Sequence, residues 1–278
     1  MSLYPNTPGP IGLFDSGYGG LTILEKVREH LPQYDYIYLG DNARAPYGNR
    51  SFDVVYEFTR QATERLFAMG CPLVIYACNA ASAKALKSVQ TNDLPLWNPD
   101  RRVLGIIRPT AEYLGDISKT KHIGIFATIG TVQSNSYPLE IQKLYPEMTV
   151  TCQACPLWVP LIENEEYDGE GADYFVQKYT HQLFEKDPLI DTVILGCTHY
   201  PLLFKKIKKY LPENVTPILQ GDIVADSLKN YLQRHTTLEQ LLTRNGSCQF
   251  FTTESAEKFQ HSATIFLHQH VAAQHIKL

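Results

Sequence analysis

Short apolar runs alternate with helical patterns along this chain. The run at 11–14 (Ile-Gly-Leu-Phe) stops at Asp15, and a glycine-rich turn follows. After the turn, Leu24, Val27 and Leu31 recur at helical spacing, which places them on one face of a helix. A strand, a polar turn and a helix form the building unit of parallel α/β proteins, and the pattern therefore predicts an α/β fold.

Residues capable of chemistry stand where several of the other apolar runs end. These runs end at Asp41, at Cys78 and Asn79, at Thr128, and at Cys197 and Thr198. In open parallel sheets, ligands bind in the crevice beyond the carboxyl ends of the strands. We therefore expect these side chains to meet in one crevice.

The chain also repeats itself weakly. The segment IGLFDSGYG from Ile11 aligns with IGIFATIGT from Ile123, and VIYACN from Val74 aligns with VILGCT from Val193. The order and the approximate spacing of the two segments are the same in both halves. The repeat favours two similar lobes related by a pseudo-twofold axis, each contributing one thiol; chance similarity between hydrophobic strands is the alternative.

Length and composition indicate a folded protein of two domains, although one large α/β domain also fits. The chain has 278 residues, and a domain typically has about 150. Its content of 44% hydrophobic and 19% charged residues is ordinary for globular proteins. The net charge of -4 and the absence of a basic run predict no nucleic-acid partner. Lys205, Lys206, Lys208 and Lys209 lie in a helical pattern that predicts a solvated face.

The sequence further predicts a protein of the cytoplasm that has no membrane partner. No run approaches the roughly 20 apolar residues that cross a bilayer, and the first ten residues do not resemble a signal peptide. Six cysteines without regular dense spacing predict free thiols in a reducing compartment.

Cys78 and Cys197 are the leading candidates for catalysis. A thiolate is a base as well as a nucleophile, and its pKa falls at a helix N-terminus, so we expect each thiol to be partly ionised. Two thiols on opposite sides of one carbon suit the inversion of a stereocentre. A carbanion formed there needs fixed donors, and the candidates are Ser16, Asn79, Thr128, Thr198 and backbone amides.

Other candidate groups have simpler interpretations. A free cysteine commonly fills core space, and for Cys152 and Cys155 packing is favoured over a redox pair or half a zinc site. His268, His270 and His275 fit no metal motif, and no metal site is predicted. The stretch DSGYGG matches no nucleotide-binding loop; its acidic residue either points into the crevice or caps a helix.

Taken in order, the motifs resemble those of the glutamate racemases, within the cofactor-independent aspartate/glutamate racemase superfamily. The matching segments are IGLFDSGYGGLTIL, GDNARAPYG, ACNAASA, IGIFATIGTVQSNSY, PLWVPLIE and GCTHYP, and they span nearly the whole chain. His199, after Cys197 and Thr198, is as in glutamate racemases, whereas aspartate racemases typically carry an acidic residue there.

This resemblance implies a fold and a domain organisation. The expected fold is α/β, with two similar lobes of mainly parallel sheets flanked by helices, pseudo-twofold related, and the active site in the cleft between them. Residues 1–107 with 222–278 would form the first lobe, and 108–221 the second. A homodimer is also implied.

The resemblance implies interconversion of L- and D-glutamate without pyridoxal phosphate, metal or any other cofactor, supplying D-glutamate for peptidoglycan. Cys78 would act as the base on D-glutamate and Cys197 on L-glutamate. Asp15, His199 and Glu163 resemble auxiliary acid/base groups. The positions that resemble substrate contacts are Asp15, Ser16, Pro46, Tyr47, Gly48, Asn79, Ala80, Thr128, Thr131, Thr198 and His199.

One position departs from the family pattern. The usual C-N-T-A-S reads C-N-A-A-S here, and Ala80 lacks the hydroxyl of the usual Thr. The backbone amide, a neighbouring hydroxyl or a water can take the place of that hydroxyl, so the effect on substrate affinity stays open. Three alternatives stay open at this point: a racemase of aspartate or another acidic amino acid, a hydrolase with Cys197 as nucleophile and His199 as base, and a two-lobed amino-acid-binding protein.

Overall fold

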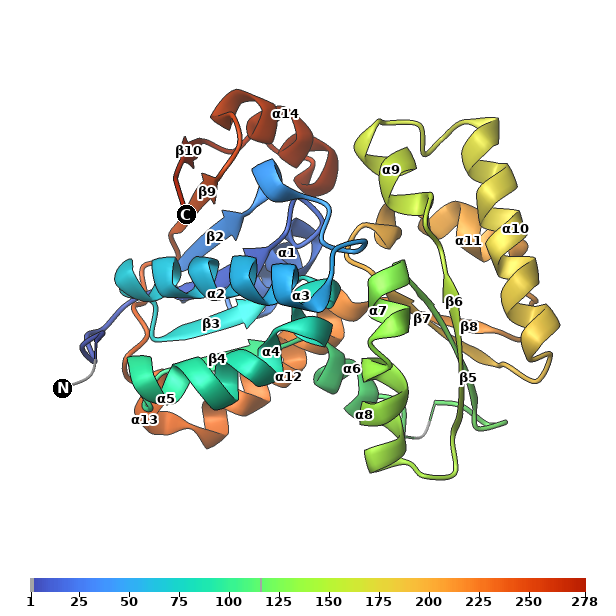
Figure 1. Ribbon diagram of the computed structural model, residues 1–278, viewed down its shortest axis with the longest axis horizontal. Helices are drawn as coiled ribbons and strands as arrows, with labels where there is room; N and C mark the ends of the chain where they lie inside the picture. The colour runs from blue at the N-terminus through green and yellow to red at the C-terminus, as the bar shows by residue number, and fades with distance from the viewer. Residues whose placement is uncertain (1–2, 116) are drawn as a thin grey trace.

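The computed structural model describes residues 3–115 and 117–278, which form two parallel β-sheets flanked by helices (Figure 1). The larger sheet has the strand order β10-β9-β2-β1-β3-β4 and the smaller one β6-β5-β7-β8. Every strand pair in these sheets is parallel. The predicted α/β architecture with two parallel sheets is therefore confirmed.

The strands of the two sheets have the following bounds. The larger sheet contains β1 (Ile11–Asp15), β2 (Tyr36–Gly40), β3 (Leu73–Tyr76), β4 (Arg102–Gly105), β9 (Cys248–Thr252) and β10 (Ala273–His275). The smaller sheet contains β5 (His122–Ala127), β6 (Thr149–Ala154), β7 (Thr192–Gly196) and β8 (Thr216–Ile218).

Helices cover both sheets. Those that precede β5 are α1 (Leu21–His30), η1 (Asn42–Arg44), α2 (Phe52–Ala68), α3 (Asn79–Lys84), α4 (Leu86–Ser88), the π-helical turn η2 (Val89–Asp93), α5 (Leu94–Trp97) and α6 (Ile107–Glu112). Those that follow it are α7 (Ile129–Gln133), α8 (Ser136–Leu144), α9 (Trp158–Glu163), α10 (Glu170–Lys186), η3 (Tyr200–Leu203), α11 (Phe204–Tyr210), α12 (Gln220–Arg234), α13 (Thr236–Glu239) and α14 (Ala256–Leu267).

The two sheets repeat one strand order. Within β2-β1-β3-β4 and within β6-β5-β7-β8, the strand that comes second in the chain lies outermost, followed by the first, third and fourth. The two segments that align in the sequence occupy the first and third strands of each set. Each candidate thiol therefore follows the third strand of its set, which supports two similar lobes over a chance match.

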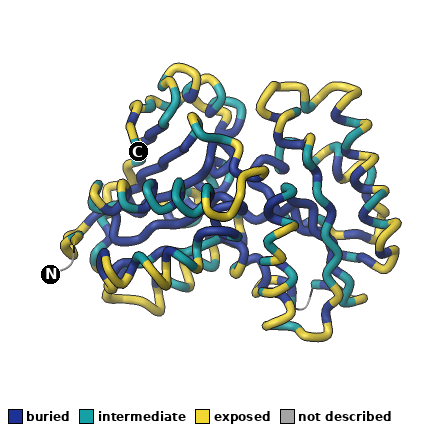
Figure 2. Tube along the Cα trace, in the orientation of Figure 1, coloured by how far each residue is buried: buried dark blue, intermediate teal, exposed yellow. Residues whose placement is uncertain are grey.

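Burial explains why the strands were visible in the sequence. All residues of β1, β2, β3 and β7 are buried, because helices cover both faces of the sheets. Figure 2 shows these strands as dark blue segments enclosed by helices with exposed outer faces. Helix α1 buries Leu24 and Val27 as predicted, and it packs along α12.

The end of the chain returns to the larger sheet. Strand β9 pairs with β2, and α14 packs against α1 (Figure 1). Asp35 fixes this return, because it accepts hydrogen bonds from the Ser247 amide (2.9 Å), the Ser247 hydroxyl (2.6 Å) and the Asn245 side chain (2.7 Å). This arrangement is consistent with a first lobe made of 1–107 and 222–278; the exact division stays a prediction.

Several simpler predictions also agree with the structure. All six cysteines are free, and the histidines at 268, 270 and 275 are exposed. Lys205, Lys208 and Lys209 are exposed on α11. Within residues 3–115 and 117–278, no helix is both long enough and apolar enough to span a bilayer.

Candidate active site

Cys78 and Cys197 line one pocket, which lies at the carboxyl ends of β3 and β7. Its cavity volume is about 50 Å³. The predicted site residues that line it are Ser16, Pro46, Tyr47, Gly48, Cys78, Asn79, Ala80, Thr128, Glu163, Cys197, Thr198 and His199. The expectation that strand-end residues from both halves of the chain meet in one crevice is confirmed for Cys78, Asn79, Thr128, Cys197 and Thr198, whereas Asp41 does not line the pocket.

Asp15 and Thr131 were also predicted to contact substrate, but neither lines the pocket. Asp15 is fully buried, and one carboxylate oxygen accepts a hydrogen bond from the Gly17 amide at 2.8 Å. The Thr131 hydroxyl lies 3.1 Å from that of Thr128, which does line the pocket. In this structure Thr131 contacts a lining side chain, and Asp15 holds the backbone next to the lining residue Ser16.

Five lining residues were not predicted from the sequence: Asn49, Cys155, Pro156, Val159 and Pro160. Most of them belong to α9 or the turn before it, where an apolar helical pattern looks like ordinary core. Cys155 is a third thiol at the pocket, although packing was the favoured interpretation. Burial raises its pKa well above the ordinary value, which keeps it a neutral thiol.

Cys78 occupies the N-cap of α3, where its sulfur accepts a hydrogen bond from the Ala81 amide at 3.5 Å. The thiol also lies 3.5 Å from the Ser16 hydroxyl, to which it donates. Burial and the nearby Asp15 carboxyl nevertheless raise the pKa of Cys78 to about 12. The expectation of partial ionisation is wrong for this residue, because desolvation outweighs the helix N-terminus. At neutral pH Cys78 is therefore a thiol and a proton donor.

Ionisation of Asp15 and ionisation of Cys78 disfavour each other. Burial raises the pKa of Asp15, while His199 and the Gly17 amide act in the opposite direction. Because a second negative charge in this buried region is unfavourable, the carboxyl and the thiol are not both ionised easily.

The surroundings of Cys197 are different. The residue precedes the 3-10 helix η3, so no α-helix begins directly after it, contrary to the sequence-based expectation. Instead, the Nδ1 atom of His199 lies 3.9 Å from its sulfur, and the Nε2 atom lies 3.1 Å from Glu163 Oε1. Burial alone would lower the pKa of His199, but its contacts with Cys197 and Glu163 raise it to about 10. A protonated imidazole beside a sulfur favours the thiolate form.

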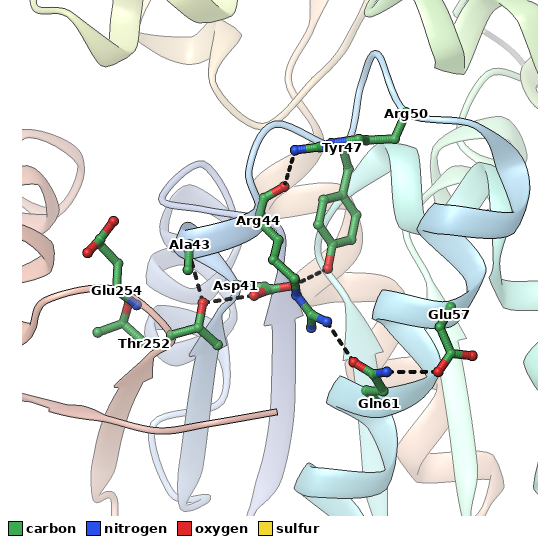
Figure 3. Close-up of polar contacts among 10 residues, drawn as sticks. Asp41, Ala43, Arg44, Tyr47, Arg50, Glu57, Gln61, Thr252 and Glu254 are labelled. Atoms are coloured by element: carbon green, nitrogen blue, oxygen red, sulfur yellow. Dashed lines mark hydrogen bonds and ion pairs between the residues drawn. The ribbon is translucent and has the colours of Figure 1, made fainter.

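The rim segment around Pro46–Gly48 is fixed from below by the buried Asp41. The Tyr47 hydroxyl donates to Asp41, the Arg44 Nε atom donates at 2.6 Å, and the Thr253 hydroxyl at 2.8 Å. Figure 3 shows Tyr47 and Arg44 converging on this carboxylate. At the rim itself, the Gly48 carbonyl accepts a hydrogen bond from the Gly130 amide of α7 at 2.8 Å. The rim therefore connects the two halves of the molecule beside the pocket.

The Asn79 side chain belongs to a buried network that also crosses between the halves. Its amide nitrogen donates to Gln220 at 2.7 Å, and its oxygen accepts from the Tyr137 hydroxyl at 2.6 Å. Gln220 in turn donates to Thr110 at 2.9 Å. At most one amide hydrogen of Asn79 is left for a ligand, which limits its expected part in binding a carbanion.

No metal site accompanies these groups in the part of the chain that the structure describes, since no cluster of three or more His, Cys, Asp or Glu side chains there is suited to hold an ion. The described side chains offer proton transfer. Cys197 lies beside the charged His199 on one side of the pocket, and the Cys78 thiol lies on the other.

Comparison with known proteins identifies the group to which this site belongs. The family model described as Asp/Glu/Hydantoin racemase matches residues 21–225. The chain belongs to the Asp/Glu/hydantoin racemase family. As predicted, it is therefore related to amino-acid racemases, which are isomerases.

Within this racemase family, the chain is similar to curated glutamate racemases over almost its whole length. It is 41% identical over 272 residues to the glutamate racemase of Roseobacter denitrificans, covering 94% of this chain and 97% of that protein. It is 36% identical over 271 residues to that of Shouchella clausii, covering 96% and 94%.

Solved racemase structures share the fold. A glutamate racemase isoform of Bacillus anthracis matches with a TM-score of 0.88 and 35% identity, covering 97% of this chain and 98% of that chain. The Francisella tularensis glutamate racemase, solved in complex with D-glutamate, matches with a TM-score of 0.84 and 31% identity, covering 99% and 98%. The fold predicted from the resemblance is confirmed by these matches.

Proposed function

We propose that this protein interconverts L- and D-glutamate by proton transfer at the α-carbon, with Cys78 and Cys197 as the two acid/base groups and no cofactor. The observation that carries the proposal is the pair of thiols, which come from corresponding positions of two similar halves and line one pocket. The similarity to glutamate racemases over more than nine tenths of the chain supports glutamate as the substrate.

In the direction from L to D, Cys197 takes the α-proton. His199 stabilises the thiolate that takes the proton, because its imidazole has a pKa of about 10 and stays protonated below that pH. The Cys78 thiol then delivers its own proton to the opposite face of the carbon. One C–H bond breaks and another forms, and the configuration is inverted without any change in oxidation state.

In the direction from D to L the roles reverse, and Cys78 must first lose its proton. The resting protonation of the empty site, with Cys78 neutral and His199 charged, is therefore the form that receives L-glutamate. L- and D-glutamate have equal free energies, so kcat/KM is equal in both directions. The asymmetry of the site therefore makes KM and kcat each differ between the two directions by the same factor.

The polar groups around the pocket hold the substrate and stabilise the carbanion. Hydroxyl groups of Ser16, Thr128 and Thr198 are available, together with the backbone amides at Gly48 and Ala80. Asp15 acts on the reaction through Cys78, and Glu163 acts through His199. These assignments are consistent with the contacts described above.

A cysteine hydrolase is the second candidate, and one observation favours it. Cys197, His199 and Glu163 form a thiol–imidazole–carboxylate chain of the kind that activates a nucleophile. That interpretation gives Cys78 no role. A racemase acting on aspartate or another acidic amino acid keeps both thiols in use and differs only in the side chain it admits.

The proposal extends to the setting of the enzyme. We infer a homodimer in the cytoplasm that supplies D-glutamate for peptidoglycan, with the lobe division at 107/108 and 221/222. Growth of a D-glutamate-requiring bacterial strain after expression of this chain tests the supply of D-glutamate. Light scattering on the purified protein tests the dimer.

The direct test incubates purified protein with L-glutamate in deuterated water without added cofactor. Chiral chromatography with mass spectrometry should detect D-glutamate carrying one deuterium at the α-carbon. Parallel reactions with L-aspartate and L-glutamine define the substrate. Absence of inversion and of deuterium incorporation with all three substrates would reject the racemase proposal in favour of the hydrolase.

A further inference from the structure

Among the described residues that line the pocket, the cationic side chain is the His199 imidazolium, which is already paired with Glu163. Glutamate carries two carboxylates and one ammonium group, and it therefore enters the pocket with a net negative charge. None of the described residues that line the pocket is Lys or Arg, and the Glu163 carboxylate adds a negative charge. An anionic ligand in a small, partly dry cavity needs a compensating positive charge close by.

Lys84 is a buried cation next to this pocket. It is the last residue of α3 and lies one helical turn beyond Ala80, which lines the pocket, so both side chains leave the same helix face. Only 7% of Lys84 is exposed. Lysine is rarely buried to this extent without an ionic partner, because removing its charge from water is costly.

The contacts of the Lys84 ammonium group compensate its charge only in part. Its Nζ atom donates to the Arg50 carbonyl at 2.5 Å and lies 5.4 Å from the centroid of the Phe52 ring. In the described part of the chain, no carboxylate forms an ion pair with it. The nitrogen atom therefore lacks the negative partner that a structural buried cation needs.

The ammonium group lies directly behind the pocket wall. A Cβ atom placed on Gly130 would overlap both the Lys84 nitrogen and the Gly48 carbonyl oxygen, so these two atoms flank the same point. Gly48 lines the pocket, and its own missing Cβ would overlap Thr128, another lining residue. The cation therefore lies beside the backbone at Gly48, which lines the cavity.

We propose that Lys84 supplies the positive charge that sets the affinity of this site for a dicarboxylate substrate, acting through the wall formed by Gly48 and Thr128. The inference rests on the proposed function and adds a determinant of affinity to it. Burial lowers the pKa of Lys84, and Cys78 opposes this effect, which agrees with an ammonium group close enough to sense the site. Substrate binding then provides the negative partner that Lys84 does not find among the described residues.

Because the charge is costly in the empty protein, its removal separates binding from stability. Lys84→Met keeps the length of the side chain and removes the charge. It should raise KM for both enantiomers of glutamate about 10-fold, leave kcat within about threefold, and leave the melting temperature equal to or above that of the parent protein. Lys84→Arg, which keeps the charge, should keep KM closer to the parent value than the Met variant.

The matched control is Lys87→Met, which removes an exposed lysine three residues further along the chain. Its KM should equal that of the parent protein. If KM is unchanged in Lys84→Met, the inference is wrong. A lower melting temperature together with a fall in kcat and an unchanged KM would assign Lys84 a structural role and would also overturn it.

Calorimetric binding of glutarate, a dicarboxylate with no amino group and no stereocentre, makes the test independent of turnover. The dissociation constant should rise about 10-fold in Lys84→Met and stay unchanged in Lys87→Met. If the parent protein does not racemise glutamate but its glutarate affinity falls in Lys84→Met alone, the racemase function is rejected and the role of Lys84 is kept. If the parent protein racemises glutamate but all variants bind glutarate equally well, the racemase function is kept and the role of Lys84 is rejected. A parent protein that does not bind glutarate would also overturn the role of Lys84.

Discussion

The Nδ1 atom of His199 lies 3.9 Å from the sulfur of Cys197. This contact makes the two halves of the pocket chemically unequal, because in the described part of the chain no cationic side chain is hydrogen-bonded to Cys78, a thiol whose pKa is raised to about 12. The site thus holds a protonated thiol on one side and a thiol beside a charged imidazole on the other.

Glu163→Gln should shift the pH range of activity. Glu163 helps to raise the pKa of His199 to about 10, so the imidazolium is present below that pH and is lost above it. Without the carboxylate, the pKa of His199 falls, and the decline of kcat/KM at alkaline pH should begin at lower pH, equally in both directions. At neutral pH a loss of about 10-fold is expected.

The pH profile of kcat/KM measures this effect. Glu165→Gln is the control, because Glu165 is exposed and its carboxylate pairs with the exposed His261 at 3.2 Å, away from His199. Superimposable profiles for Glu163→Gln and the parent protein would show that Glu163 does not act on His199.

Tyr47→Phe should loosen the rim of the pocket. The Tyr47 hydroxyl donates to the buried Asp41 carboxylate, and its loss leaves Asp41 with one donor fewer. We expect a loss of about 1–2 kcal/mol in unfolding free energy and a rise in KM with little change in kcat. Tyr56→Phe, which removes a partly exposed hydroxyl bond to Asp93, is the control. An unchanged KM in Tyr47→Phe would mean that the rim is held by its other contacts alone.

Asp35→Ala should weaken the attachment of the C-terminal part of the chain. Burial opposes ionisation of Asp35, but hydrogen bonds from Ser247, Thr243 and Asn245 outweigh it and lower the pKa of this carboxyl. Such a group stabilises the fold above the ordinary carboxyl pKa, and the stabilisation is lost as pH falls below that value towards the lowered one.

Asp35→Ala should therefore cost about 2–4 kcal/mol at pH 7 and clearly less at pH 3. Thermal unfolding at the two pH values measures the difference, with the exposed Asp100→Ala as control. An equal loss at both pH values would contradict the role of the ionised carboxylate.

Ala80→Thr should strengthen substrate binding. Ala80 lines the pocket and has no hydroxyl to offer to a carboxylate. One added hydrogen bond corresponds to a decrease in KM of about 5- to 10-fold. The KM values for both enantiomers provide the check. A higher KM with a lower melting temperature would show that the cavity has no room for the larger side chain.

The positions of the thiols could be predicted because parallel strands covered on both faces leave continuous apolar runs that end at polar residues. Cys78 and Cys197 could therefore be recognised in the sequence as strand-end residues.

The order of the strands could not be predicted, since the pairing of β9 with β2 joins segments that are far apart in the chain.

Electrostatic properties escaped prediction for a similar reason. The raised pKa of Cys78 depends on burial and on Asp15, and the pairing of Asn79 with Gln220 depends on a helix from a distant segment. The wall around Val159 looks like core in the sequence because pocket walls and cores share apolar composition. Lys84 gave no signal, since a lysine at the end of a helical pattern normally faces solvent.

The central claim is that each thiol serves one enantiomer, and single-cysteine variants in deuterated water test it most directly. Cys78→Ser should exchange the α-hydrogen of L-glutamate with retention of configuration and leave D-glutamate unlabelled, while Cys197→Ser should label only D-glutamate. Neither variant should invert glutamate at the parent rate. Inversion at the parent rate by either variant, or labelling of the opposite enantiomer, would contradict the account.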